Sequence, residues 1–261
     1  MPSINYAFVN GQFLPEDRAT VSIFDRGFLY GEGCFETMRV YEGRFFRARH
    51  HFDRLFAGLK SLGIESPFSA EEVNDVCRKL TQMNGISSGV VRVYITPNSS
   101  VVTSQPRVFA TRVLRAIVST VRVDPLLARN KTANRLPYIL AQREATAAGA
   151  DDAVLLNASG NLVELTTSNL FVVHKGRLLT PPLVDGPLPG VTRRAVIELA
   201  EKLKILVCEQ SLSPESLEGA DETLATNSLI EIVPISNWSR DDAVTRRLQA
   251  AYRQLVQTEA V

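Results

Sequence analysis

The stretch that decides the fold is Asn130–Leu140, with the sequence NKTANRLPYIL. It offers a single amine, Lys131, at the mouth of an apolar segment with helical spacing. Downstream, Leu162–Phe171 reads LVELTTSNLF and offers a single carboxylate, Glu164, in the middle of a strand-like run. An unpaired carboxylate would be costly in that apolar context. The two stretches therefore indicate an amine nucleophile and a buried acid.

The composition is that of an ordinary globular protein with one or two domains: 261 residues, 45% of them hydrophobic and 22% charged. The 29 Lys and Arg residues nearly balance 28 Asp and Glu residues, so no global field favours nucleic acid or an anionic membrane. Cys34, Cys77 and Cys208 are scattered, which indicates neither disulfides nor a metal site and suits a reducing compartment. Without an export signal or an apolar run long enough to cross a bilayer, we expect a cytoplasmic protein.

Two β-hairpins are expected in the N-terminal part of the chain. Asn10–Gly11 suits a tight primed turn because both positions tolerate positive φ, and Glu42–Gly43 would turn the second hairpin. The predicted strands are Ile4–Val9, Gln12–Leu14, Cys34–Tyr41 and Arg44–Phe46. Neither GxGxxG nor GxxxxGK[ST] occurs between the hairpins, so a phosphate site must be sought elsewhere.

Helices and further strands follow. Apolar residues at helical spacing predict a helix over Arg47–Leu62 that ends at Gly63, and Ser69–Glu72 has the form of a capping box that begins another. Valine-rich alternation predicts strands over Gly89–Thr96 and Pro106–Ile117. The intervening TPNSSVVTSQ is expected to be a short polar loop.

We expect an N-terminal α+β domain over residues 1–118 and a C-terminal α+β domain over residues 119–261. In the second, a helix is predicted over Leu136–Gly149, with Leu136, Ile139, Leu140 and Ala147 on its apolar side. Gly190 precedes another helix, and a terminal helix begins near Asp241. The predicted strands are Asp152–Asn157, Leu162–Thr166, Leu170–His174, Arg177–Thr180, Ile205–Gln210, Glu222–Thr226 and Ile230–Pro234. This irregular order favours an α+β fold over a doubly wound parallel sheet.

Six stretches along almost the whole chain carry a family resemblance: FDRGFLYGEGCFETMRVYEG, HFDRL, NKTANRLPYILAQREA, GADDAVLLNASGNLVELTTSNLFVV, LLTPPLVDGPLPGVTR and LATNSLIEIVPI. Together they resemble the class IV aminotransferases, the fold-type IV pyridoxal phosphate enzymes that include branched-chain aminotransferase, D-amino acid aminotransferase and aminodeoxychorismate lyase. The resemblance implies a two-domain α+β fold like that of D-amino acid aminotransferase. It also implies pyridoxal 5'-phosphate as the cofactor.

The resemblance gives roles to three charged residues. Lys131 matches the Schiff-base lysine, which would hold the cofactor from the C-terminal domain and move the α-proton of the substrate. Glu164 matches the acid that keeps the pyridine nitrogen protonated. Arg54 matches the phosphate-binding arginine, whose planar fork suits phosphate oxygens.

Four more residues are expected at the cofactor. Val191 and Thr192 begin a helix at PGVTR, where free N–H groups and the positive helix end attract an anion. Ser228, in ATNSL, matches a further phosphate contact. Arg135 falls near a group that hydrogen-bonds the phenolic oxygen of the cofactor in several members, although an outward-facing arginine fits this position as well.

The substrate pocket is less determined. Tyr30, Phe35 and Arg92 match pocket positions of the family. Many relatives have a TRG or SRG loop after the strand that ends near Thr96, and an Arg or His there binds the substrate carboxylate. This chain has ITPNSSVVTSQPR instead, so the carboxylate site is missing or rebuilt. Arg92 is one candidate replacement, and the others are Arg107 and Arg39.

The resemblance implies three alternatives for function. The first is a transaminase that moves an amino group between an amino acid or amine and a 2-keto acid. The second is an aminodeoxychorismate lyase that releases pyruvate and p-aminobenzoate. The third is a non-catalytic member that binds the cofactor, or only its phosphate, as a sensor or interaction module. Family members act as homodimers, and the aromatic-rich segment Phe24–Phe35 would leave an apolar patch exposed in a monomer unless it is buried within the chain.

Overall fold

The structure is a computed structural model that describes residues 5–110 and 112–260. The chain divides into two compact units, and each is considered by itself. Unit 1 comprises the described residues of Met1–Phe109, Asn130–Asn134 and Thr258–Val261. Unit 2 comprises the described residues of Ala110–Arg129 and Arg135–Gln257. The division at residue 109 differs from the predicted boundary at 118.

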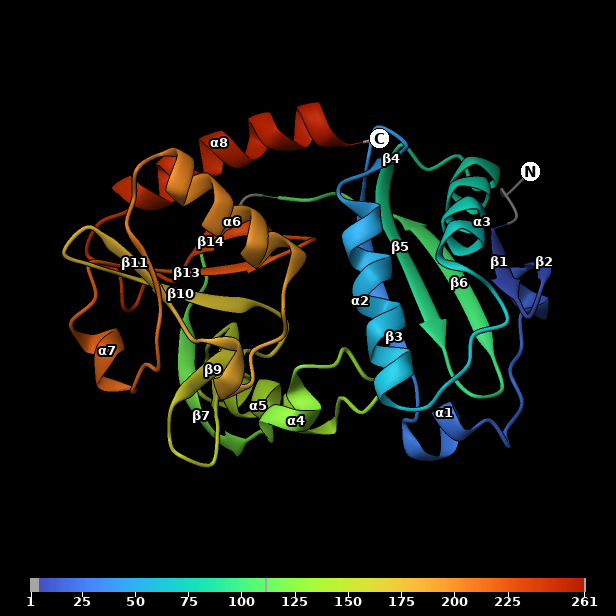
Figure 1. The fold of residues 1–261 in the computed structure, drawn as a ribbon, viewed down its shortest axis with the longest axis horizontal. Coiled ribbons are helices and arrows are strands. Elements are labelled where there is room, and N and C mark those ends of the chain that lie inside the picture. Colours follow the sequence, from blue (N-terminus) through green and yellow to red (C-terminus); the bar gives the residue numbers. More distant parts are fainter. Residues whose placement is uncertain (1–4, 111, 261) are drawn as a thin grey trace. The chain divides into compact units, whose positions relative to one another are not determined.

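A six-stranded antiparallel sheet forms the body of unit 1, with the strand order β2-β1-β6-β5-β3-β4 (Figure 1). The two predicted hairpins are confirmed, with turns at Asn10–Gly11 and Glu42–Gly43, while Ile4 lies outside the described residues. The strands are β1 (Tyr6–Val9), β2 (Gln12–Pro15), β3 (Cys34–Tyr41), β4 (Arg44–Phe45), β5 (Ser88–Ile95) and β6 (Ser100–Pro106). A 3-10 turn, Glu16–Arg18, and the short helix α1 (Arg26–Tyr30) connect β2 to β3.

Two helices, α2 (Ala48–Ser61) and α3 (Ala70–Met83), pack against one face of this sheet. The predicted capping box at Ser69 is present, because its hydroxyl accepts from Glu72 N while the Glu72 carboxylate accepts from Ser69 N. Gly63 follows α2 with φ +67°, the left-handed geometry that glycine allows at a helix end. Phe52, Leu55 and Leu80 from these helices join alternate residues of β3, β5 and β6 in one core.

The predicted polar loop before Pro106 is wrong in its second half. Residues 100–106 form β6, which pairs with β5 over its whole length, and the true turn is the short segment between Ile95 and Ser100. Ser100, Val102 and Ser104 face the core, so two of the three core-facing positions of this strand carry serine and not the apolar residue that marks a buried strand face. The predicted strand Pro106–Ile117 is also wrong. Of its described residues, only Pro106, at the end of β6, and Ala116 and Ile117, at the start of β7 (Ala116–Arg122), belong to a strand.

Unit 2 contains an eight-stranded sheet with the order β12-β11-β10-β9-β8-β7, and β13 and β14 continue it from β10. Pairs β7–β8 and β11–β12 are parallel, and the others are antiparallel. The remaining strands are β8 (Asp152–Leu156), β9 (Leu162–Leu165), β10 (Asn169–His174), β11 (Arg177–Thr180), β12 (Val207–Glu209), β13 (Glu222–Asn227) and β14 (Glu231–Pro234). The predicted α+β class is confirmed.

The helices of unit 2 are α4 (Pro125–Ala128), α5 (Leu136–Ala147), α6 (Val191–Lys202), α7 (Glu215–Glu218) and α8 (Ala243–Glu259), whose last residues belong to unit 1, and a 3-10 turn covers Leu183–Asp185. The predicted apolar side of α5 is wrong. Tyr138, Ala141 and Ala145 are the buried residues of α5, while Leu136 is 58% exposed. The small alanines allow this helix to lie close to β7 and β8, with which it packs.

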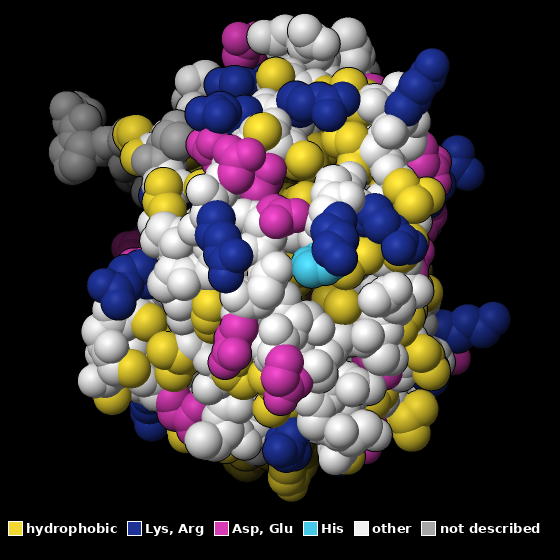
Figure 2. Space-filling view, turned by 90° about the vertical axis from the view of Figure 1, so that its left-hand side faces the viewer, with side chains coloured by type: hydrophobic (Ala, Val, Ile, Leu, Met, Phe, Trp, Pro, Cys, Tyr) yellow, Lys and Arg dark blue, Asp and Glu magenta, His cyan; other side chains and the backbone are white. Residues whose placement is uncertain are grey.

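Basic and acidic side chains alternate with small hydrophobic areas on the face of the protein shown in Figure 2, and neither sign dominates it. That distribution agrees with the near-zero net charge of the sequence. Among the described residues, no helix combines the length and the apolar character that crossing a membrane requires.

Candidate active site

Lys131 is held by the sheet of unit 1, although the sequence placed it in the C-terminal domain. Phe35 N donates to Lys131 O at 2.9 Å, and Ala133 N donates to Gly33 O at 2.8 Å. Thr132 also bridges to Cys34 at the start of β3. These bonds explain why residues 130–134 group with unit 1.

Two of the cationic side chains predicted at the site lie next to the ring of Phe35. Lys131 Nζ lies 4.6 Å from its centroid, and the guanidinium carbon of Arg92 lies 6.0 Å from it. The ring also stacks on Tyr94, with centroids 5.7 Å apart. Lys131, Phe35 and Arg92 are therefore brought together on the sheet face opposite the α2–α3 core.

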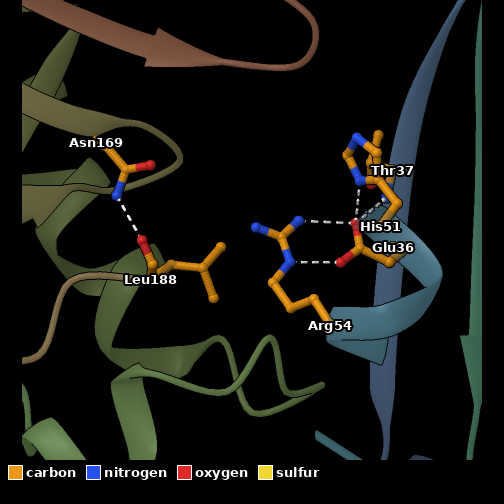
Figure 3. Close-up of polar contacts among 6 residues, drawn as sticks. All are labelled: Glu36, Thr37, His51, Arg54, Asn169 and Leu188. Carbon is orange, nitrogen blue, oxygen red and sulfur yellow. Dashed lines mark hydrogen bonds and ion pairs between the residues drawn. The ribbon is translucent and has the colours of Figure 1, made fainter. Parts of the chain in front are cut away.

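Arg54, the predicted phosphate ligand, is engaged in a buried network on α2 and β3. Its Nε donates to Glu36 Oε1 at 2.7 Å, and its Nη2 donates to Glu36 Oε2 at 2.9 Å. His51 Nδ1 lies 2.8 Å from Glu36 Oε2, and Thr37 N donates to the same oxygen at 3.2 Å (Figure 3). Because an ionised carboxylate only accepts, Nδ1 carries the proton.

The network has defined charges. Burial alone would raise the pKa of Glu36, but Arg54 and His51 outweigh it and hold the pKa of that carboxyl far below its ordinary value. Burial lowers the pKa of His51, and the positive charges of Arg54 and Lys131 lower it further. The Glu36 carboxylate favours the protonated imidazole, but it does not outweigh them, and the pKa of His51 stays below its ordinary value. Arg54 thus presents its guanidinium in an orientation fixed by a charged partner.

Asp25, at the N-cap of α1, ties that helix to the β5–β6 turn. Its carboxylate accepts from Gly27 N at 2.6 Å, from Thr96 Oγ1 at 2.8 Å and from Ser99 Oγ. Burial would raise the pKa of Asp25, but these hydrogen bonds lower it below its ordinary value. The turn that replaces the familiar carboxylate-binding loop is thereby joined to α1, which bears Tyr30.

In unit 2, Glu164 is buried and accepts hydrogen bonds at both carboxylate oxygens. Tyr138 Oη donates to Oε1 at 3.3 Å, while Leu188 N at 3.0 Å and Asn169 Nδ2 at 3.3 Å donate to Oε2. Burial and the neighbouring carboxylate raise the pKa of Tyr138, so its phenol remains a donor. Glu164 is thus a partnered buried acid, as the apolar context of its strand required.

Arg135 lies beside this acid. Its guanidinium stacks on the Tyr138 ring at 3.6 Å and donates from Nη2 to Thr166 O at 2.5 Å. The residue therefore turns toward the protein and is not the outward-facing arginine that the sequence also allowed. Ser228 lies in the turn after β13, where Asn227 Oδ1 accepts from Leu229 N and Ile230 N.

The start of α6 has the properties of an anion site. Gly190 is its N-cap, and no described side chain caps its free N–H groups. Thr192 is 2% exposed, and its Oγ1 has no hydrogen-bond partner in the part of the chain that the structure describes. A buried hydroxyl without a partner is expensive unless a ligand supplies one. Val191 and Thr192 therefore fit a group that carries anionic oxygens.

Sequence reasoning missed several residues that position the predicted ones: Glu36, His51, Asp25, Tyr138 and Asn169. Glu36 could have been identified from the sequence. It lies on the core-facing side of β3, between Cys34 and Met38, where a single acidic side chain needs a polar partner. Asn169 had none, because only the fold brings it to Leu188.

Comparisons with known proteins give a consistent result. The sequence matches the family described as Amino-transferase class IV over residues 33–238. It is 37% identical over 247 residues, 87% of this chain and 86% of the other, to a protein of Methanocaldococcus jannaschii assigned as a branched-chain-amino-acid aminotransferase. It is 26% identical over 283 residues, 97% of this chain and 99% of the other, to the D-alanine aminotransferase of Staphylococcus epidermidis.

Solved structures resemble nearly the whole chain. The branched-chain amino acid aminotransferase of Escherichia coli superposes with a TM-score of 0.91 at 28% identity, covering 97% of this chain and 94% of that one. Another branched-chain amino acid aminotransferase, solved with pyridoxamine 5'-phosphate, gives 0.91 at 26% identity, with coverages of 97% and 95%. A Legionella pneumophila protein assigned as a 4-amino-4-deoxychorismate lyase gives 0.85 at 30% identity, with coverages of 92% and 97%.

Proposed function

The chain belongs to the class IV aminotransferases, and on that basis we propose that it is a pyridoxal phosphate-dependent transaminase acting between an amino acid and a 2-keto acid. The observation that carries the cofactor assignment is the unpartnered Thr192 hydroxyl, buried at the uncapped N-terminus of α6 within the described part of the chain. When bound, pyridoxal phosphate supplies an aldehyde that condenses with amines and a ring that accepts electrons after the α-proton leaves.

The residues of this chain would divide the work as follows. Lys131 would hold the cofactor covalently and move the α-proton of the substrate through Nζ. Glu164 would accept a hydrogen bond from the ring nitrogen and so keep that nitrogen protonated. The donors Tyr138 Oη, Asn169 Nδ2 and Leu188 N already use this buried carboxylate as an acceptor. Arg135, which turns inward at Tyr138, would contact the phenolic oxygen of the cofactor.

The phosphate group would be bound by residues that each offer donors. These are the backbone N–H groups of Val191 and Thr192, the Thr192 hydroxyl, the guanidinium of Arg54 and Ser228. The Glu36 carboxylate would fix the orientation of the Arg54 guanidinium while it binds the phosphate group.

The substrate would be recognised by Tyr30, Phe35 and Arg92. Arg92 is the strongest candidate for the carboxylate, because it shares the Phe35 ring with Lys131 Nζ. Arg39, by contrast, stacks on Phe109 at 3.9 Å and on Tyr41 at 4.6 Å. Arg107 also lies beside Phe109, at 5.7 Å, so neither is associated with Lys131 in the way that Arg92 is.

The test is spectroscopic and chemical. Protein loaded with pyridoxal phosphate should show a near-visible band that borohydride abolishes, and Lys131→Ala should lack it. L-leucine, D-alanine and L-glutamate should each be tried with 2-keto acids to find the amino donor. A wild-type protein that binds the cofactor yet converts no amine would favour the non-catalytic alternative.

A lyase remains the second candidate, supported by the likeness to the Legionella pneumophila protein. Incubation with aminodeoxychorismate decides between the two functions. Formation of p-aminobenzoate without amine transfer would replace the transaminase proposal.

We also propose a cytoplasmic homodimer. Phe24 is 77% exposed and Phe28 69% exposed, so the segment before β3 leaves apolar surface uncovered within one chain. Light scattering at micromolar concentration should give twice the 28.8 kDa mass of the chain. The double substitution of Phe24 and Phe28 to Ser should shift the protein toward the monomer, and a monomeric wild type would contradict the proposal.

A further inference from the structure

Asn169, the first residue of β10, joins the two parts of unit 2 that are proposed to bind opposite ends of the cofactor. Its Nδ2 donates to Leu188 O at 2.8 Å and to Glu164 Oε2 at 3.3 Å. Leu188 N donates to the same Glu164 oxygen at 3.0 Å. Figure 3 shows the Asn169 amide directed at the Leu188 carbonyl. Glu164, Asn169 and Leu188 therefore form a closed set of hydrogen bonds.

The other side of the Asn169 amide touches Gly190. A Cβ atom built on Gly190 would lie 2.0 Å from Asn169 Oδ1, which no side chain could tolerate without displacement. Gly190 has φ −65°, an ordinary value for any residue, so the space beside Asn169 and not the backbone conformation requires glycine here. The segment from Leu188 to Gly190, which leads into α6, is thus hydrogen-bonded and packed against one buried side chain.

Pyridoxal phosphate is a rigid ring with a short arm, so its nitrogen and its phosphate are separated by a nearly fixed distance. A protein binds both ends at once only if its two sites have the matching separation, and an error of about an ångström weakens both interactions. We propose that Asn169 is a positioning residue that sets the separation between Glu164 and the N-terminus of α6. The inference rests on the proposed function.

The two sites that would bind the ring nitrogen and the phosphate would each keep their own binding groups without Asn169. Glu164 would keep the donors Leu188 N and Tyr138 Oη, and α6 would keep its free N–H groups and the Thr192 hydroxyl. Loss of Asn169 would therefore weaken a ligand that spans both ends far more than a ligand that uses one end. This difference separates a positioning role from a general contribution to folding.

The experiment compares three probes on the full-length protein. Pyridoxal phosphate spans both ends, pyridoxal uses the ring end, and inorganic phosphate uses the phosphate end. Their dissociation constants are measured for the wild type, Asn169→Ala and Asn169→Ser, the second substitution keeping a small polar group if alanine impairs folding. Asn237→Ala is the matched control, because the Asn237 side chain also hydrogen-bonds the backbone of a distant segment, accepting from Ala116 N and donating to Ala116 O.

For the Asn169 variants we expect the dissociation constant of pyridoxal phosphate to rise at least about tenfold, equivalent to ~1.4 kcal/mol. Those of pyridoxal and inorganic phosphate should change no more than about twofold (~0.4 kcal/mol). Asn237→Ala should leave all three unchanged. An equal loss for all three probes, or no loss for pyridoxal phosphate, would overturn the positioning role while leaving the cofactor assignment standing. A wild-type protein that does not bind pyridoxal phosphate would overturn both.

Discussion

Arg54 donates from Nε and Nη2 to the two carboxylate oxygens of Glu36, at 2.7 and 2.9 Å, and the Glu36 side chain is fully buried. The same carboxylate binds His51. A buried charge pair is stable only while both partners remain, since removing one leaves the other unpaired in an apolar environment. The orientation of Arg54 therefore depends on Glu36.

Glu36→Gln should destabilise the protein by about 3–5 kcal/mol, because Arg54, whose side chain is only 11% exposed, would lose the fully buried carboxylate to which it donates from two nitrogens. Urea unfolding at pH 7 measures the change. The exposed pair of Arg44 and Glu42, at 3.3 Å, supplies the control, and Glu42→Gln should cost no more than about 1 kcal/mol. Equal effects of the two substitutions would contradict the structural importance of Glu36.

The same variant has a pH signature. The pKa of Glu36 is lowered in the folded protein, so its stabilising effect is present above the unfolded pKa of about 4.3 and is lost as the pH falls below that value. The stability difference between wild type and Glu36→Gln should therefore shrink in acid. A difference that stays constant from pH 7 to the acid range would be inconsistent with an ionised Glu36.

Thr192→Val should have opposite effects on folding and on cofactor binding. Valine has the shape of threonine without the unpartnered hydroxyl, so the protein without cofactor should be as stable as the wild type or more stable by about 1 kcal/mol. Affinity for pyridoxal phosphate should fall about tenfold because one phosphate donor is lost. Thermal unfolding and cofactor titration measure the two effects.

Thr245 provides the matched control for that prediction. It is equally buried near the start of a helix, but its Oγ1 donates to Glu222 at 2.7 Å. Thr245→Val should lower stability by about 1 kcal/mol and leave cofactor affinity unchanged. If both valine variants behave alike, the Thr192 hydroxyl has no role in binding.

Local patterns predicted most elements of the fold, and the failures have a common physical cause. Capping at Ser69 and the turn at Asn10–Gly11 depend on neighbours in sequence, so the sequence contains their whole explanation. Strand β6 was missed because Ser100 and Ser104 face the core, where Ser104 accepts a hydrogen bond from Asn84. The partner lies 20 residues away in sequence, and no local pattern contains it.

The candidate site shows the same division. Lys131, Glu164 and Arg54 stand in stretches that resemble a known family, so their types and order identified them. Asn169 could not be identified in this way. Its importance depends on contacts with Leu188 and Gly190, about 20 residues away, that exist only after folding.

Gly190→Ala should displace the Asn169 amide and the start of α6 together, because the new Cβ would meet Asn169 Oδ1 at 2.0 Å. Overpacking of this kind costs about 1–3 kcal/mol. Affinity for pyridoxal phosphate should fall as well. Gly219→Ala is the control, since Gly219 has φ −96° and open space around its Cβ position, and it should be neutral in both measurements.

Asp152→Asn should stabilise the protein more as the pH rises. Asp152 accepts from Thr166 Oγ1 at 2.5 Å and from Ala153 N at 2.8 Å, yet burial raises its pKa above the ordinary value of about 3.9. An acid with a raised folded pKa costs no stability when both states are protonated, and its cost appears as the pH rises through the folded pKa.

Asparagine keeps the acceptor oxygen for Thr166 and removes the charge, so the gain over wild type should be small near pH 4 and larger at pH 8. Urea unfolding across this range measures it. Asp75→Asn, at an exposed position of α3, is the control and should show no such trend. A gain for Asp152→Asn that is largest in acid would mean that the buried carboxylate is stabilised as an anion, and that the charge of Arg112 outweighs its burial.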